Sequence, residues 1–94
     1  MVTILVKHTV KNFDAWKPVY DKHGATRKAG GCKGTYVFRE ADKPNTVFAL
    51  LNWNTMENAR KFATSENLRE TMRKAGVEGT PEVHFLNEAA KTTE

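Results

Sequence analysis

Two of the three histidines in this 94-residue sequence lie in strand-like segments, where they are suited to acid–base chemistry. His8 lies near the end of an apolar run, and His84 follows Glu82 by two residues in a run near the C-terminus. If the two segments are antiparallel neighbours, His8 approaches Glu82 or His84. Because a histidine beside a carboxylate exchanges protons near neutral pH, we predict that His8 and His84 are catalytic. The alternative is that each is an ordinary strand histidine, bonded to the backbone or exposed to water.

His23 and Arg27 extend a helical stripe of aromatic residues. Phe13, Trp16, Tyr20, His23 and Arg27 follow one another at steps of three and four, the spacing of one helix face. If that face meets a sheet, His23 is a third catalytic candidate and Arg27 contacts the ligand, because a buried guanidinium needs a carboxylate or an anionic ligand. If the helix has frayed by residue 27, Arg27 lies in water, and the sequence favours this second interpretation. For His23 it favours neither.

Aromatic side chains are numerous for so short a chain, with five Phe, two Trp and two Tyr. They are candidate walls of a pocket for a small apolar or aromatic ligand. The predicted ligand-binding residues are Trp16, Tyr20, Arg27, Tyr36, Trp53 and Phe62, with Phe48 as a further candidate wall. The hydroxyl groups of Tyr20 and Tyr36 can donate hydrogen bonds to a phenol or an enolate. The alternative is that these rings simply fill the core.

Charge and hydropathy exclude several classes of partner. The net charge is +4, and residues 1–39 hold eight basic against two acidic side chains. These basic residues are spaced singly among apolar ones and do not form the dense basic stripe that nucleic-acid binding needs. No apolar run is long enough to cross a membrane, and Met1 leads directly into a strand-like run. We therefore expect no nucleic acid, no membrane and no signal peptide.

Cys32 is the single cysteine, which excludes an internal disulfide and a multi-cysteine zinc site and favours a cytoplasmic protein. Two histidines and a glutamate lack the spacing of a metal motif, so no metal site is expected. Gly30, Gly31 and Gly34 follow a helical segment and precede a strand, the reverse of a phosphate-binding loop. No flavin or nicotinamide motif is present, so we expect no cofactor.

The hydrophobic pattern divides the chain into strands and helices. Asn12, Thr55 and Ser65 are plausible helix N-caps, and Pro18 predicts a bend or tight turn near residues 14–17. Alternating or continuous apolar runs predict strands over residues 2–10, 34–39, 46–53 and 82–86. Helices are predicted over residues 13–29, 56–63 and 66–75, a loop over 78–81 and a flexible tail over 88–94.

The resulting order, βαββαβ, is the ferredoxin-like arrangement of the α+β class. Right-handed crossovers place the first and third strands in the middle of an antiparallel sheet, with the helices on one face. Both central strands are apolar on both faces, so the face without helices also needs a cover. We predict a single domain over residues 1–94 and a two-fold symmetric homodimer, in which a second copy covers that face.

Four stretches of the sequence carry a family resemblance. They are Lys7-His8-Thr9-Val10, Asn12-Phe13-Asp14-Ala15-Trp16-Lys17, Leu51-Asn52-Trp53, and the spaced residues Ala59, Phe62, Ser65, Leu68, Met72 and Ala75-Gly76-Val77. Together they resemble the antibiotic biosynthesis monooxygenase-like group of the dimeric α+β barrel superfamily, over about residues 2–87. The resemblance implies a dimeric α+β barrel with a ligand pocket between the sheet and the helices of each subunit.

The resemblance implies a cofactor-independent monooxygenase that acts on an aromatic or polyketide-like small molecule. His8, His23 or Tyr36 would take the substrate's proton before the substrate reacts with oxygen. Haem-degrading members of the superfamily use an asparagine, a tryptophan and a histidine ligand on the second helical segment. Trp53 matches the tryptophan, but residues 54–83 contain no histidine, so haem degradation is not expected. Two alternatives stay open: a non-oxidative binding, cyclase-type or isomerase-type protein, and a non-catalytic dimerisation module.

Overall fold

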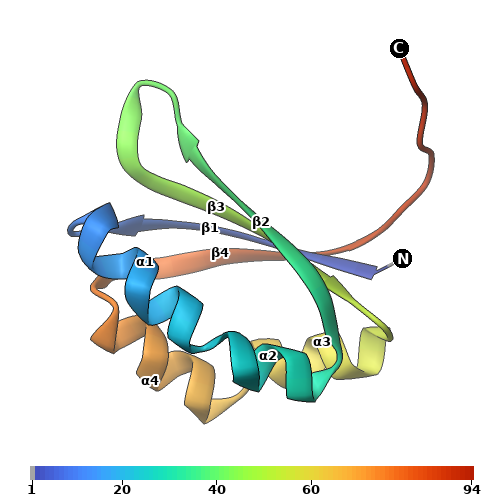
Figure 1. Cartoon of the computed structure of the whole chain (residues 1–94), viewed down its shortest axis with the longest axis horizontal. Coiled ribbons are helices and arrows are strands. Elements are labelled where there is room, and N and C mark those ends of the chain that lie inside the picture. Colours follow the sequence, from blue (N-terminus) through green and yellow to red (C-terminus); the bar gives the residue numbers. More distant parts are fainter. Residues whose placement is uncertain (1) are drawn as a thin grey trace.

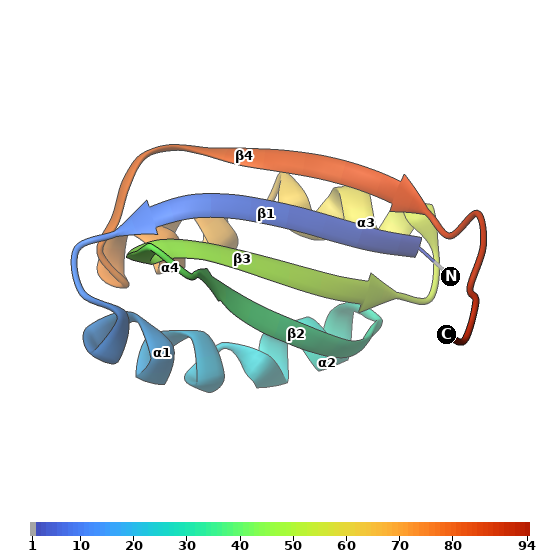
Figure 2. The same ribbon diagram turned by 90° about the horizontal axis from the view of Figure 1, so that it is seen from above.

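The computed structural model describes residues 2–94 and contains a four-stranded antiparallel sheet with helices on one face (Figure 1). The strands are β1 (Val2–Val10), β2 (Cys32–Glu40), β3 (Lys43–Trp53) and β4 (Val77–Asn87). The helices are α1 (Phe13–Lys22), α2 (Gly24–Gly30), α3 (Met56–Ala63) and α4 (Glu66–Lys74). The strand order is β2-β3-β1-β4, as Figure 2 shows from above. The predicted ferredoxin-like α+β fold is confirmed, with β1 and β3 at the centre.

The core lies between the helices and the inner face of the two central strands. Alternate residues of β1 are buried from Ile4 to Val10, and alternate residues of β3 are buried from Val47 to Trp53. The register places Ile4 opposite Leu51, so the two buried rows meet on the same face. This period of two is the one that the sequence shows, because successive side chains of a strand point to opposite faces.

The three predicted N-caps are confirmed. Asn12 Oδ1 accepts a hydrogen bond from the Ala15 backbone amide, and Thr55 and Ser65 accept equivalent bonds at the starts of α3 and α4, each 3.1 Å long. Such a bond supplies a partner for an amide that has none inside the helix. The caps therefore define where three of the four helices begin.

The first helical region breaks at a different place from the one predicted. Pro18 lies inside α1, and α1 continues to Lys22, where the chain turns at His23 before α2 begins. The single helix over 13–29 is therefore wrong, whereas the bend or tight first turn expected near residues 14–17 lies inside α1 and stays a prediction. Pro18 removes only one backbone donor, whereas Gly24 at the start of α2 has a low intrinsic preference for helix. The break therefore lies beside the glycine, at His23, and not at the proline.

The C-terminal strand is longer than predicted and irregular beside His8. Pairing with β1 passes from Lys7–Glu82 directly to Thr9–Glu78, so three residues of β4 lie opposite His8 alone. The predicted loop over 78–81 is thus part of β4 and forms a bulge. Pro81 is compatible with this position because β4 is an edge strand and the bulge interrupts the hydrogen-bond ladder.

The sheet face opposite the helices is bare, as Figure 1 shows, and it carries a group of apolar side chains among polar ones. The register places Leu5, Phe48 and Leu50 on it, all half-buried. Tyr36 and Phe38 continue this face on β2 with 60% and 52% of their surface exposed, and Leu86 on β4 is 41% exposed. This bare face is the surface on which the dimer prediction rests.

Beyond β4, residues 88–94 are exposed and form neither helix nor strand, and their flexibility stays a prediction. None of the helices described in residues 2–94 has the length and apolar character needed to cross a membrane.

Gly31→Ala is expected to destabilise the protein by roughly 1–3 kcal/mol. Gly31 ends α2 with a φ of 114°, and an added Cβ would lie 2.5 Å from Oδ1 of Asn54. The same residue accepts a hydrogen bond from the Asn54 amide, so the backbone cannot easily turn away. Urea denaturation would measure the loss. Gly34→Ala is the matched control because nothing lies within 4 Å of its added Cβ, and equal losses in both variants would contradict the argument.

Candidate active site

A cavity of about 50 Å³ lies between the inner face of the sheet and the helices. Its lining residues are Val6, His8, Trp16, Tyr20, His23, Arg27, Ala49, Leu51, Phe62, Leu68, Thr71, Met72 and Ala75. The strand residues are buried, whereas His23, Leu68 and Met72 are only half-buried. The cavity therefore approaches the surface between the α1–α2 pair and the α3–α4 pair, with its floor on the sheet.

His8 is the polar group on the floor of this cavity. The residue is 7% exposed, its ring centroid lies 5.4 Å from that of Trp16, and neither ring nitrogen has a hydrogen-bond partner among residues 2–94. Burial lowers the pKa of His8 from 6.5 to about 4, so the imidazole is neutral at neutral pH. A neutral imidazole offers one acceptor and one donor. Because unpartnered buried polar groups are rare and costly, His8 is placed to exchange a proton with a ligand.

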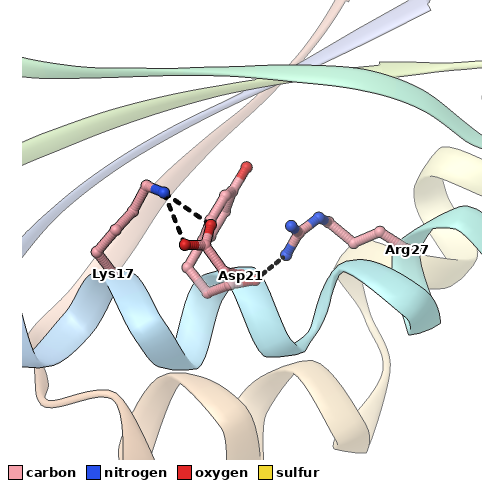
Figure 3. Close-up of polar contacts among 4 residues, drawn as sticks. Lys17, Asp21 and Arg27 are labelled. Atoms are coloured by element: carbon pink, nitrogen blue, oxygen red, sulfur yellow. Dashed lines mark hydrogen bonds and ion pairs between the residues drawn. The ribbon is translucent and has the colours of Figure 1, made fainter.

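Arg27 is buried, so its interpretation as a solvated residue is wrong. The side chain is 7% exposed because α2 continues to Gly30 and holds Arg27 against the core. Its Nη1 donates a 2.9 Å hydrogen bond to the Tyr20 carbonyl, and its guanidinium lies 3.9 Å from the Tyr20 ring centroid. Figure 3 shows Arg27 reaching back toward α1, while the Asp21 carboxylate faces Lys17 at 2.7 Å. Within residues 2–94, Arg27 forms no ion pair with a carboxylate.

Tyr20 lies between these groups and stacks on Trp16, with ring centroids 4.8 Å apart. Its hydroxyl is buried without a hydrogen bond of ordinary geometry. Burial raises the pKa of Tyr20, and the neighbouring Thr35 hydroxyl and the Arg27 charge oppose that rise. The phenol is therefore neutral at neutral pH and free to donate to a ligand.

His23 lies at the mouth of the cavity. Its Nε2 is hydrogen-bonded to Oδ1 of Asn67 on α4, and its ring centroid is 5.8 Å from that of Phe62. Since an amide oxygen only accepts, Nε2 donates in this hydrogen bond. His23 thus links the α1–α2 junction to α4 across the mouth, and its catalytic role stays a prediction.

His84 does not approach His8. It lies opposite Leu5 on the bare face, where its Nε2 is 3.0 Å from Oε1 of Glu82. This hydrogen bond lowers the pKa of the Glu82 carboxyl, which is exposed. The predicted proximity of His8 to His84 or Glu82 is wrong because the register pairs His84 with Leu5 and Glu82 with Lys7, whose side chains face the side of the sheet opposite to that of His8.

The predicted aromatic walls also divide between the two sides of the sheet. Trp16, Tyr20 and Phe62 line the cavity, whereas Tyr36 and Phe48 lie on the bare face. The prediction that Tyr36 and Phe48 line the cavity is therefore wrong. Trp53 is buried on the inner face against Phe62, with ring centroids 4.9 Å apart, and belongs to the core outside the cavity lining.

The cavity wall supplied by α4 and its C-cap is not among the predicted site residues. Leu68, Thr71, Met72 and Ala75 line the cavity at spacings of i, i+3, i+4 and i+7. This is the signature of one helix face, and it was present in the sequence. It shows that the residues share a face, but it does not distinguish a cavity wall from a filled core.

Solved structures with the same architecture include SnoaB, a cofactor-independent oxygenase from Streptomyces nogalater. It superposes with a TM-score of 0.80 at 18% identity, over 99% of this chain and 97% of that one. An antibiotic biosynthesis monooxygenase assigned in Bordetella bronchiseptica superposes with a TM-score of 0.79 at 16% identity, over 95% and 97%. This chain has the fold of the antibiotic biosynthesis monooxygenase-like proteins. No protein-family model and no curated protein sequence matches it.

In this monooxygenase-like fold the chemistry available to the cavity is proton transfer. A neutral base on the sheet, a guanidinium without a carboxylate and apolar walls together favour formation of an anion from a weak organic acid. Within residues 2–94, no three His, Cys, Asp or Glu side chains gather in a way that could hold a metal ion.

Acidification is expected to weaken the fold through His8. The folded-state pKa is about 4 and the ordinary value is 6.5, so between these two values the unfolded chain binds a proton that the folded chain does not. Stability contributed by neutral His8 is therefore complete above about pH 6.5 and lost toward pH 4, by about 3 kcal/mol. Urea unfolding at pH 7 and pH 4.5 would measure this. His8→Phe should remove most of this pH dependence, whereas His84→Gln, which affects only the exposed pair with Glu82, should remove little of it. Identical pH profiles for the wild type and His8→Phe would contradict the assignment.

Proposed function

We propose that the chain is a cofactor-independent monooxygenase that acts on an aromatic or polyketide-like small molecule in the cavity between sheet and helices. The observation that carries the proposal is His8, a neutral and unpartnered base buried on the cavity floor beside Trp16. Its position fits removal of a proton from a phenol, an enol or an activated CH₂ group. The name of the similar SnoaB structure, a cofactor-independent oxygenase, is consistent with this chemistry.

Transfer of the proton produces two opposite charges side by side, one on His8 and one on the substrate. His8 is a weak base in the empty cavity because its imidazolium would be desolvated. When the substrate gives up its proton, the imidazolium and the substrate anion form side by side and stabilise each other in the low dielectric of the cavity. The Arg27 guanidinium, which also lines the cavity, adds to the stabilisation of the anion.

Oxygen then reacts with the electron-rich anion directly. A CH₂ group activated in this way becomes a carbonyl group: one oxygen atom of O₂ bonds to the carbon, and the other leaves as water with the two hydrogens. The substrate supplies all the electrons, so the reaction needs no flavin or metal. The protein contributes orientation, the base and exclusion of bulk water.

A ring-shaped substrate must widen the mouth of the cavity. A cavity of about 150 Å³ is known to hold benzene, three times the volume of about 50 Å³ here. Leu68 and Met72 are the half-buried apolar side chains on α4 at the mouth, and methionine adapts its shape easily. We propose that the substrate enters by displacing these two side chains.

The proposal also includes a homodimeric state and a cytoplasmic location.

An oxygen electrode tests the proposal. Electron-rich quinol-like or anthrone-like substrates, with a chelator and without added flavin or metal, are expected to consume one O₂ per molecule of oxidised product. A ligand that raises the melting temperature without oxygen uptake would replace the proposal with a non-oxidative binding or isomerase-type function, which the same base can serve. No response of either kind across the substrate panel would favour the non-catalytic dimerisation module.

A further inference from the structure

Arg27 separates the internal cavity from a second hollow on the surface. A groove of about 240 Å³ lies between α2 and β2, lined by Gly24, Arg27, Lys28, Cys32, Lys33, Gly34 and Thr35. Arg27 is the one residue, within the described chain, that lines both this groove and the cavity on whose floor His8 lies. A group bound at its guanidinium is therefore within reach of a ligand in the cavity.

Within residues 2–94, no carboxylate balances the charge of Arg27. One of its five N–H groups is used by the Tyr20 carbonyl, and the nearest acid in sequence, Asp21, is bonded to Lys17 (Figure 3). No acidic residue lines the cavity or the groove, whereas Lys28 and Lys33 add positive charge to the groove. Arg27 as a whole residue is 93% buried, and a buried guanidinium with no carboxylate beside it is costly, so an anionic ligand would offset that cost.

We propose that Arg27 is an anion-binding residue and that the ligand of the cavity carries an oxyanion, a carboxylate by preference, which pairs with its guanidinium. The planar fork of an arginine matches the two oxygens of a carboxylate, and the apolar part of the ligand then contacts Trp16 and Tyr20. The inference rests on the proposed function only for the assignment of the cavity as the substrate site. The ligand class is thus an aromatic or enolic compound with an acidic group.

Calorimetric titration with three non-oxidisable probes tests this inference. Benzoate is expected to bind the wild-type protein at least about tenfold more tightly than its neutral isostere benzamide, because it gains a charge-assisted hydrogen bond. Inorganic phosphate, which has no apolar part, is expected to bind more weakly than benzoate. Arg27→Met should abolish the preference for benzoate. Lys22→Met, which removes one positive charge from an exposed site outside both hollows, should retain it.

The outcomes separate the possible roles of Arg27. Equal binding of benzoate and benzamide to the wild type would make Arg27 a structural residue that only caps the Tyr20 carbonyl, and would overturn the proposal. Phosphate binding as tight as benzoate would also overturn it, because a bare anion in the groove would then suffice. If Arg27→Met does not fold, Arg27→Lys decides: loss of several-fold in benzoate preference supports the paired fork, and an unchanged preference overturns it.

None of these probes reacts with oxygen, so the result is independent of the oxygenase assay. Failure of anion selection leaves the proposed monooxygenase reaction standing with neutral substrates. Failure of oxygen uptake together with Arg27-dependent benzoate binding leaves an acid-binding protein of the non-oxidative type.

Discussion

His8→Phe is expected to lower kcat for oxygen uptake by roughly 100- to 10,000-fold, the usual contribution of a general base. Phenylalanine retains the aromatic contact with Trp16 and removes two nitrogens that have no hydrogen-bond partner in the part of the chain that the structure describes. The variant should therefore fold at least as stably as the wild type, because an unsatisfied polar group has been replaced by an apolar one. A loss of turnover combined with unchanged or higher stability would assign His8 to the chemistry.

Variants at the other two histidines are the matched controls. His84→Gln alters a side chain that the sheet separates from the cavity, and it is expected to leave turnover unchanged. His23→Gln alters the contact with Asn67 at the mouth and is expected to change KM more than kcat, because that bond links the α1–α2 junction to α4 across the mouth. Wild-type turnover in the double variant of His8 and His23 would show that neither histidine is the base.

The sequence predicted the fold because the determinants of the fold are local and repeated. The alternation of β1, the three N-caps and the nearly continuous apolar run of β3 each agree with one arrangement, and all of them are found in the structure. The agreement of local signals with the global fold is typical of natural sequences. The two apolar faces of the central strands also follow from the sequence alone.

The side of the sheet on which an individual side chain lies could not be predicted, because it depends on the register between neighbouring strands. Placing His84 near His8 required only that β1 and β4 be neighbours, which is correct. Whether the two rings share a face depends on a single residue of register, and the three-residue bulge opposite His8 resembles a loop in the sequence. Tyr36 is placed on the bare face by the same kind of detail, its pairing with Leu50.

The burial of Arg27 depends on a tertiary contact that the helical stripe does not reveal. The spacing from Trp16 to Arg27 correctly indicated one face, but helix fraying and helix continuation predict opposite environments at its end. In the structure a second helix, α2, begins at Gly24, and Arg27 on this helix packs on the Tyr20 ring. This contact is made between α1 and α2, so it could not be predicted from a sequence interpretation with one continuous helix.

Leu50→Asp is expected to convert the proposed homodimer to single chains. Leu50 lies at the centre of the bare face, between Leu5 on β1 and Tyr36 on β2, and is half-buried before any partner is added. If two such faces pack together, as sheets do in a sandwich, each dimer buries two new carboxylates without partners. Desolvation costs several kcal/mol for each ion, so the dimer Kd should rise by at least about 1,000-fold.

Sedimentation equilibrium at micromolar concentration measures this change directly. Ala25→Asp is the matched control, because it adds the same charge to an exposed position of α2 on the helical side of the molecule and should leave the dimer intact. Wild-type protein that sediments as single chains would remove the dimer, and would leave Tyr36, Phe38 and Leu86 as an apolar surface exposed to water. A wild-type dimer that Leu50→Asp does not weaken would place the interface elsewhere, on the helices or along the β4 edge. Dissociation by Leu50→Asp but not by Ala25→Asp would identify the bare face as the interface, because only the first variant places its charge there.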